Sequence, residues 1–147
     1  KIPVVNSKGK FTGQLIKKLN KKGIKLNITA VYTLQQVKKI NSCLNNKTNS
    51  IISIFSGRMA DVGKDPIPIV KKAILVTKNK SKVQILWAST REPYNFTQAS
   101  QLGCQIITMP PKLIEKVSTF GKSFDQLTKE TVIGFLNDSK KSRFKIQ

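Results

Sequence analysis

Two of the three arginines in the chain follow apolar runs and have a serine close by. Arg58 stands three residues after the run "SIISIF", and Arg91 ends "ILWASTR", which also contains Ser89. Guanidinium groups bind phosphate oxygens through paired N–H donors, and a hydroxyl can complete such a site. If the two runs are neighbouring strands, the three side chains would form a phosphate-binding site. The alternative is that each arginine pairs with a carboxylate at the rim, Asp61 or Glu92.

The nucleophile that the sequence offers is an amine. The chain has no histidine, which excludes a Ser-His-Asp triad, an imidazole base and a histidine-ligated metal. It also has no Walker A or G-x-G-x-x-G sequence and no paired carboxylates at strand ends. The remaining class is a lysine that forms a Schiff base with a carbonyl. Lys1, at the head of "IPVV", would suit that role as a buried amine at the mouth of a barrel; the alternative is a solvated strand end.

Apolar runs with strand character alternate with amphipathic segments along the chain. We expect strands at 2–5, 24–32, 50–55, 82–89 and 104–109. We expect helices at about 12–23, 33–44, 69–76, 93–103, 110–117 and 124–138, with 56–68 as a long loop. Each spacing fits one strand–helix unit, and runs that are apolar on both faces indicate parallel strands covered on both sides.

Side-chain types refine these helices. Thr12 and Thr33 are expected to cap the first two helices, because a threonine hydroxyl accepts a hydrogen bond from a free backbone N–H. Leu15 and Phe96 are expected on the buried faces of their helices, at helical spacing from other apolar residues. Gly103 is expected to end its helix.

The fold class is therefore α/β, either a doubly wound open sheet or part of a (β/α)8 TIM barrel. A whole barrel needs about 200 residues or more, so the 147 residues would supply about five of the eight units. In both architectures the functional side chains collect at the C-terminal ends of the strands. Asn27 and Thr29 share one face of their strand, and Ser53 and Phe55 share one face of the next.

The formal net charge of +20 raises the question of a nucleic-acid partner. Only Arg58, Arg91 and Arg143 among the 27 basic residues are arginine, the residue on which base and phosphate recognition usually depends. The lysines are scattered in pairs rather than gathered in a stripe with aromatic residues. We therefore expect no specific nucleic-acid partner, and a basic nucleic-acid-binding domain remains the third alternative for the function.

Other features indicate a cytoplasmic protein. No apolar run approaches the roughly 18 residues of a transmembrane helix, so no membrane partner is expected. The start has no hydrophobic signal segment. Cys43 and Cys104 match no metal-site spacing and are expected to be free thiols in a reducing compartment.

Five segments, in order and over nearly the whole chain, resemble the transaldolase family. "KIPV" is similar to the family's fourth-strand segment, whose lysine forms the Schiff base. The later segments are similar to the family's following strands and strand ends: "GIKLNITAVYT", "SIFSGRMAD", "ILWASTR" and "GCQIITMP".

The resemblance implies a (β/α)8 barrel, of which residues 1–147 would be a single domain and the C-terminal portion, strands four to eight. It implies a transferase that moves a dihydroxyacetone unit between sugar phosphates, in the pentose phosphate pathway, through a lysine Schiff base and with no metal or cofactor. The residues that it marks as catalytic are Lys1, Thr29, Ser53 and Phe55. The residues that it marks as substrate-binding are Asn27, Arg58, Ser89 and Arg91.

The sequence departs from the family pattern in several places. The aspartate, asparagine and glutamate of the family's first three strands have no counterpart here, and Val5 replaces a common threonine. Trp87 stands where many members have glycine or alanine, and it would either narrow the sugar site or fill a layer of the barrel interior. Phe55 matches the transferases, whereas simple aldolases carry tyrosine there.

Two alternatives within this fold remain open, a fructose-6-phosphate-type aldolase and a non-catalytic phosphosugar-binding protein. A chain that starts at strand four would leave an apolar sheet edge, so we expect the isolated fragment to be unstable or to associate. We also expect a homo-oligomer.

Overall fold

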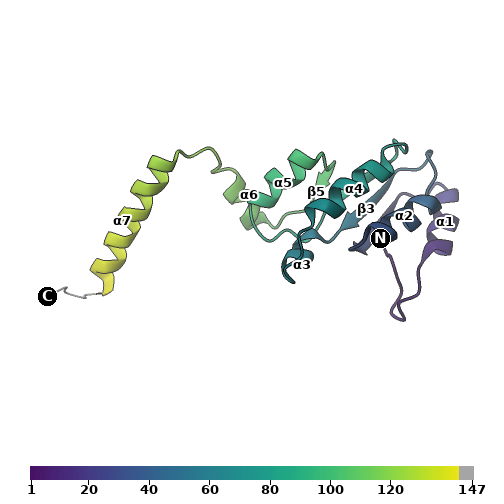
Figure 1. The fold of residues 1–147 in the computed structure, drawn as a ribbon, viewed down its shortest axis with the longest axis horizontal. Helices are drawn as coiled ribbons and strands as arrows, with labels where there is room; N and C mark the ends of the chain where they lie inside the picture. The colour runs from purple at the N-terminus through teal and green to yellow at the C-terminus, as the bar shows by residue number, and fades with distance from the viewer. Residues whose placement is uncertain (143–147) are drawn as a thin grey trace.

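Five parallel strands form one sheet in the computed structural model, which describes residues 1–142 and so leaves Arg143 outside (Figure 1). The strands are β1 (Ile2–Pro3), β2 (Leu26–Val31), β3 (Ser50–Ile54), β4 (Val83–Trp87) and β5 (Ile106–Ile107). They lie in the order β1-β2-β3-β4-β5, and every pair is parallel. A doubly wound sheet reverses its strand order at a switch point. The unbroken order is that of a barrel sheet, and the fold is α/β with five neighbouring strands of such a barrel.

Five helices connect the strands and share one core with them. The helices of the described residues are α1 (Gly13–Lys21), α2 (Leu34–Cys43), α3 (Ser56–Ala60), α4 (Ile67–Thr77), α5 (Tyr94–Leu102), α6 (Pro111–Val117) and α7 (Phe124–Ser142). Ile16 of α1, Ile40 of α2, Val70 of α4 and Ala99 of α5 are buried in the same hydrophobic cluster. Right-handed crossovers between successive strands place all connecting helices on one face of the sheet.

The strands bury one face under these helices and present the other to a cleft. Ile28, Ile52 and Ile85 are fully buried in the core and pair with one another in register. The alternate positions carry polar side chains, among them Asn27 and Ser53. Of the two architectures left open, the doubly wound sheet would have helices on both faces, whereas a sequentially ordered sheet collects its crossovers on one side, as residues 1–142 do.

The helix predictions are confirmed in outline and corrected in detail. Thr33 caps α2 in a capping box with Gln36. Thr12 precedes α1 but makes no cap, because its hydroxyl donates to the carbonyl oxygens of Pro3 and Val4 instead. The segment expected to be a loop contains the short helix α3 directly after β3.

Two residues expected on buried faces are exposed. Leu15 has 47% of its surface exposed and Phe96 has 42%. Their helices meet the sheet along a narrower stripe than the sequence pattern suggested, so that Ile16 and Ala99 carry the contact. Gly103 ends α5 in the left-handed conformation, as expected.

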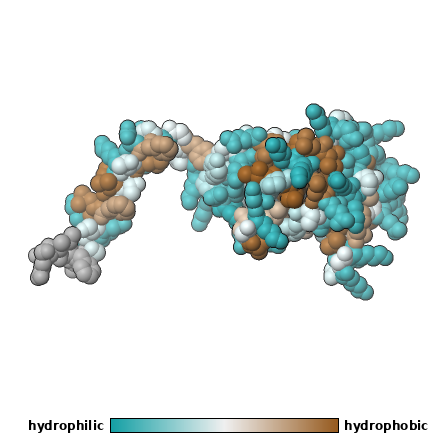
Figure 2. Space-filling model, viewed as in Figure 1, coloured by the Kyte–Doolittle hydropathy of each residue, from teal (hydrophilic) through white to brown (hydrophobic). Residues whose placement is uncertain are grey.

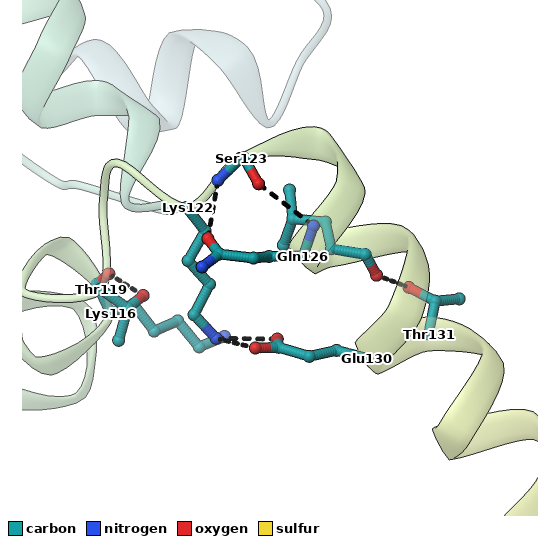
Figure 3. A network of polar contacts seen from close by, with 8 residues as sticks. Lys116, Thr119, Lys122, Ser123, Gln126, Glu130 and Thr131 are labelled. Carbon is teal, nitrogen blue, oxygen red and sulfur yellow. Dashed lines mark hydrogen bonds and ion pairs between the residues drawn. The ribbon is translucent and has the colours of Figure 1, made fainter.

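The last helix stands away from the rest of the molecule (Figure 1). Its start is fixed locally: the Ser123 N–H donates to Gln126 Oε1 at 3.0 Å, and the Gln126 N–H donates to Ser123 Oγ at 3.2 Å (Figure 3). Lys122 adds an ion pair with Glu130, Nζ to Oε2 at 2.7 Å. Apolar side chains line much of α7 in Figure 2, and Phe124 and Phe135 are 86% and 69% exposed. None of the helices within residues 1–142, α7 included, has the length and apolar character needed to cross a membrane.

Candidate active site

A cleft of about 270 Å³ opens on the helix-free face of the sheet. All eight residues expected in the site line this cleft: Lys1, Asn27, Thr29, Ser53, Phe55, Arg58, Ser89 and Arg91. The remaining lining residues are Leu86, Ala88 and Thr108. A larger hollow of about 720 Å³ lies against α1, is mostly apolar, and is lined by none of the eight.

The strand register sorts the lining residues into levels. Asn27 pairs with Ile51, and Lys1 precedes the Ile2–Ile28 pair, so Lys1 and Asn27 lie at the same deep level. Ser53 lies two residues further along its strand. Phe55, Ser89 and Thr108 follow the last residues of β3, β4 and β5 and form the rim. The cleft thus has an amine at its deep end and guanidinium groups towards its rim.

Lys1 is exposed rather than buried, which corrects the expectation of a buried amine. The strand that it precedes has only two residues and pairs with β2 on one side alone among the described residues. Among residues 1–142, therefore, no strand covers the Lys1 side chain from the other side. Lys1 nevertheless lines the same cleft as the hydroxyl and guanidinium groups.

Two hydroxyls and an amide lie next to the lysine. Ser53 is 2% exposed, and its Oγ donates to Asn27 Oδ1 at 2.7 Å. Thr29 Oγ1 is buried and has no hydrogen-bond partner among the described residues. A buried hydroxyl without a partner is costly, so this oxygen is available for a water or a substrate group.

A bulge in β2 sets the position of Thr29. Ile28 pairs with Ile52 and Val31 with Ile54, so β2 contains one more residue than β3 between these two pairs. Ala30 adopts the left-handed backbone conformation, which is uncommon for alanine, with φ of 59°. Bulges re-aim side chains next to functional sites, and this one returns Val31 to the buried face after Thr29 has faced the cleft.

Phe55 and Arg58 form one wall of the rim. The Phe55 ring makes an edge contact with Tyr32, with ring centroids 5.9 Å apart. The Arg58 guanidinium carbon lies 5.6 Å from the Phe55 centroid, a cation–π contact. Arg58 has no carboxylate partner among residues 1–142, so the alternative of a rim ion pair is wrong for this arginine.

Arg91 forms the ion pair that the alternative reading predicted. Its Nε donates to both Asp61 oxygens at 2.9 Å, and its Nη2 lies 2.5 Å from Asp61 Oδ2. These hydrogen bonds raise the pKa of Arg91 and lower the pKa of Asp61. Arg91 still lines the cleft while it is paired, so the ion pair does not remove it from the cleft.

A glycine brings the two arginine-bearing segments together. A side-chain carbon on Gly57 would lie 1.6 Å from the carbonyl oxygen of Ser89. Ser89 itself has φ of 65°, a left-handed conformation that is uncommon for serine. Only glycine permits this contact, so the segment after β3 and the segment after β4 are locked against each other.

Sequence reasoning missed the residues that hold the segment after β4. Asn95 is buried, and its Oδ1 accepts the backbone N–H of Arg91 at 3.0 Å and that of Glu92 at 3.3 Å. Buried Thr90 donates its hydroxyl to the carbonyl oxygen of Thr108. Thr108 could have been found, because it is a polar residue at the end of an apolar strand; Asn95 lies on a helix and gave no such signal.

Trp87 does not enter the cleft, which corrects both expectations for it. Its neighbours Leu86 and Ala88 line the cleft, and side chains alternate along a strand. Trp87 is 1% exposed and lies in the core with Ile54, on the face that the helices cover. It neither narrows the cleft nor fills the barrel interior.

The thiols do not compete with the amine as nucleophile. Cys43 and Cys104 are both free, as expected, and neither lines the cleft. Burial raises the pKa of Cys104 to about 11, so its thiol stays protonated at neutral pH. Within residues 1–142 no cluster of three His, Cys, Asp or Glu residues could hold a metal ion.

Comparison with known proteins shows the family of the chain. The family described as Transaldolase/Fructose-6-phosphate aldolase matches residues 1–146. The probable transaldolase of Petrotoga mobilis is 33% identical over 128 residues, which cover 86% of this chain and 53% of that protein. The probable transaldolase of Nitrosopumilus maritimus is 30% identical over 128 residues, 85% of this chain and 53% of that protein.

A third relative, the probable transaldolase of Carboxydothermus hydrogenoformans, is 31% identical over 124 residues, 84% of this chain and 54% of that protein. The chain thus spans about half the length of the curated relatives that it matches. The match over residues 1–146 and the barrel-type order of the strands lead to one conclusion: the chain belongs to the transaldolase/fructose-6-phosphate aldolase family.

Proposed function

We propose that the protein transfers a dihydroxyacetone unit between sugar phosphates through a Schiff base on Lys1. The observation that supports this most is the single cleft that collects one amine, four hydroxyls and two guanidinium groups at one end of the sheet. We further propose that residues 1–147 form one domain, equivalent to strands four to eight of the barrel, of a cytoplasmic protein. The proposed catalytic residues are Lys1, Thr29, Ser53 and Phe55.

The proposed reaction begins when the Lys1 amine adds to the carbonyl carbon of a ketose phosphate and water leaves, which forms an iminium ion. The hydroxyl two carbons from the iminium carbon then loses its proton to the water that Thr29 would hold. The carbon–carbon bond between the first and second carbons beyond the iminium carbon breaks, and its electron pair moves towards the iminium nitrogen. An aldehyde departs and an enamine stays on Lys1. The enamine attacks a second aldehyde, and hydrolysis of the new imine restores the amine.

Binding and proton handling are assigned to the rest of the cleft. Arg58, Ser89 and Arg91 would hold the phosphate at the rim by charge-assisted hydrogen bonds. Asn27 would bind a substrate hydroxyl, because its Oδ1 is already engaged by Ser53 and its amide N–H groups remain. Thr29, whose hydroxyl is buried and unpaired, would hold the water that is lost and regained.

The test is borohydride trapping of the full-length protein with fructose 6-phosphate, followed by peptide mapping. Borohydride reduces an imine to a stable amine, so we expect a sugar adduct on the peptide that contains Lys1. Lys1→Arg keeps the charge but cannot form the imine, and it should abolish both the adduct and turnover. An adduct on another lysine, or none, would contradict the assignment.

One observation favours a second candidate of a different class. The net charge of +20 suits a polyanion. Binding to arbitrary DNA that falls steeply with salt, together with no adduct, would favour a nucleic-acid-binding protein instead.

A further inference from the structure

Asp61 accepts more hydrogen bonds from Arg91 than a single-contact surface ion pair would. Arg91 Nε lies 2.9 Å from each oxygen of the Asp61 carboxylate, and Nη2 lies 2.5 Å from Oδ2. One edge of the guanidinium group is therefore occupied. The Nη1 donors have no partner among the described residues, so they remain for another acceptor.

The position of Asp61 lets it link two separate segments of the rim. It lies at the C-terminal end of α3, where its N–H donates to the Gly57 carbonyl at 2.9 Å. Arg58 stands three residues earlier on the same helix, whereas Arg91 follows β4. The carboxylate therefore fixes the guanidinium group of Arg91 relative to the helix that carries Arg58.

Without this contact only the backbone of Arg91 would be held. Its N–H donates to Asn95 Oδ1 at 3.0 Å. The side chain is 45% exposed and would be free to take many rotamers in water. A phosphate that binds a free arginine must order it on binding, which weakens affinity.

Resting on the proposed function, we propose that Asp61 is a positioning residue for the substrate phosphate. It holds Arg91 by one edge so that the other donors are already oriented, together with Arg58, when a phosphomonoester enters the rim. The ligand class is a sugar phosphate or inorganic phosphate, recognised through the phosphate group itself.

A competing effect has the opposite sign. The Asp61 carboxylate repels a phosphate dianion, so its removal could strengthen binding. The Asp61 side chain is also 45% exposed, and solvent and salt screen charges at such positions. Orientation of the guanidinium group should therefore outweigh repulsion.

The experiment is isothermal titration calorimetry of inorganic phosphate and of fructose 6-phosphate into the full-length protein at physiological ionic strength, where the Asp61 charge is screened. We expect Asp61→Ala to weaken both affinities about threefold to tenfold. Asp61→Asn keeps one acceptor oxygen and should lie between the wild type and Asp61→Ala. Glu92→Gln is the matched control: it removes one negative charge beside Arg91 without touching the guanidinium group, and it should leave both affinities unchanged.

The outcomes separate this inference from the proposed function. Phosphate binding that weakens in the order wild type, Asn, Ala supports the inference even if no Schiff base forms on Lys1. Unchanged or tighter binding in Asp61→Ala overturns it, because repulsion would then dominate. A wild-type protein that binds no phosphate also overturns it. If Glu92→Gln weakens binding as much as Asp61→Ala, the loss is not specific to the carboxylate that holds Arg91, and the inference is overturned.

Discussion

Individual residues divide the cleft into two chemical regions. Asn27, Thr29 and Ser53 supply neutral donors and acceptors around the amine of Lys1. Arg58 and Arg91 supply positive charge further out. Phe55 lies between the two regions, because it lines the cleft and its ring makes a cation–π contact with Arg58.

The Phe55 ring offers no proton to an intermediate held in the cleft. In the proposed reaction an enamine that gains a proton is released as free dihydroxyacetone, whereas an unprotonated enamine waits for an aldehyde. Phe55→Tyr would place a hydroxyl beside the cleft, where it can position a water or donate a proton. We therefore expect the wild type to favour transfer and Phe55→Tyr to shift the ratio towards release. The measurement compares free dihydroxyacetone with transfer to erythrose 4-phosphate.

Tyr32→Phe provides the control for this experiment. Tyr32 packs edge-on against Phe55 but lines a neighbouring hollow rather than the cleft. Its hydroxyl should therefore have no effect on the ratio. Release that dominates in the wild type, or a ratio that Phe55→Tyr does not move, would make Phe55 a packing residue.

Between elements, the contact that matters most for the rim is the one from Gly57 to the Ser89 carbonyl. It joins α3 to the segment after β4 and so sets the distance between the two arginines. Asn95 and Thr90 hold the second segment from its other side. The proposed phosphate site would depend on these junctions as much as on its own side chains.

Gly57→Ala should disrupt this junction. The new methyl group would overlap the Ser89 carbonyl, and a clash of this kind between packed segments typically costs about 1–3 kcal/mol. We expect a lower urea midpoint and weaker phosphate binding. Gly134→Ala in α7 is the control: nothing lies within 4 Å of the added carbon, and replacing a helical glycine should stabilise the protein by about 0.5–1 kcal/mol. If Gly57→Ala leaves phosphate binding as intact as Gly134→Ala does, the contact between Gly57 and the Ser89 carbonyl does not determine the geometry of the rim.

The sequence was sufficient to predict the elements whose signals are local. The strands, the Thr33 cap and the Gly103 terminus follow from patterns within a few residues. α3 was missed because a five-residue helix is too short to show a helical period. The eight lining residues were found because polar residues at strand ends and the family resemblance pointed to the same positions.

What the sequence could not give is distance between segments far apart in the chain. Arg91 and Asp61 are 30 residues apart in the chain. The sequence was compatible both with an ion pair between them and with an unpaired Arg91. The orientation of Trp87 depends on the register of β4 with β3, which no local pattern reveals. The exposure of Lys1 depends on which strands lie beside β1.

For the whole molecule, the apolar side chains of α7 predict association. Phe124 and Phe135 are largely exposed, and Val132 and Leu136 are more than half exposed. Exposed apolar surface of this kind commonly marks an interface. We expect the full-length protein to form a homo-oligomer, and expect a Phe124→Ser, Phe135→Ser double variant to have a lower mass in light scattering after size-exclusion chromatography.

Asp125→Ser on the same helix is the control and should keep the wild-type mass, because its side chain is polar and exposed. A wild type that is monomeric at micromolar concentration would contradict the prediction. So would an oligomer that the double variant does not weaken.

The sequential order of the strands also determines how the chain can assemble during synthesis. Each strand pairs with the one made just before it, and ribosomes add about 5–20 residues per second. Each new strand can therefore pair with a strand that was synthesised seconds earlier. No strand depends for its pairing on a segment far away in the sequence. The deep end of the cleft, carried by β1 to β3, would form first. The phosphate-binding rim would be completed only when β4 and the residues after it have left the ribosome, so a stalled nascent chain would have the amine before it has both arginines.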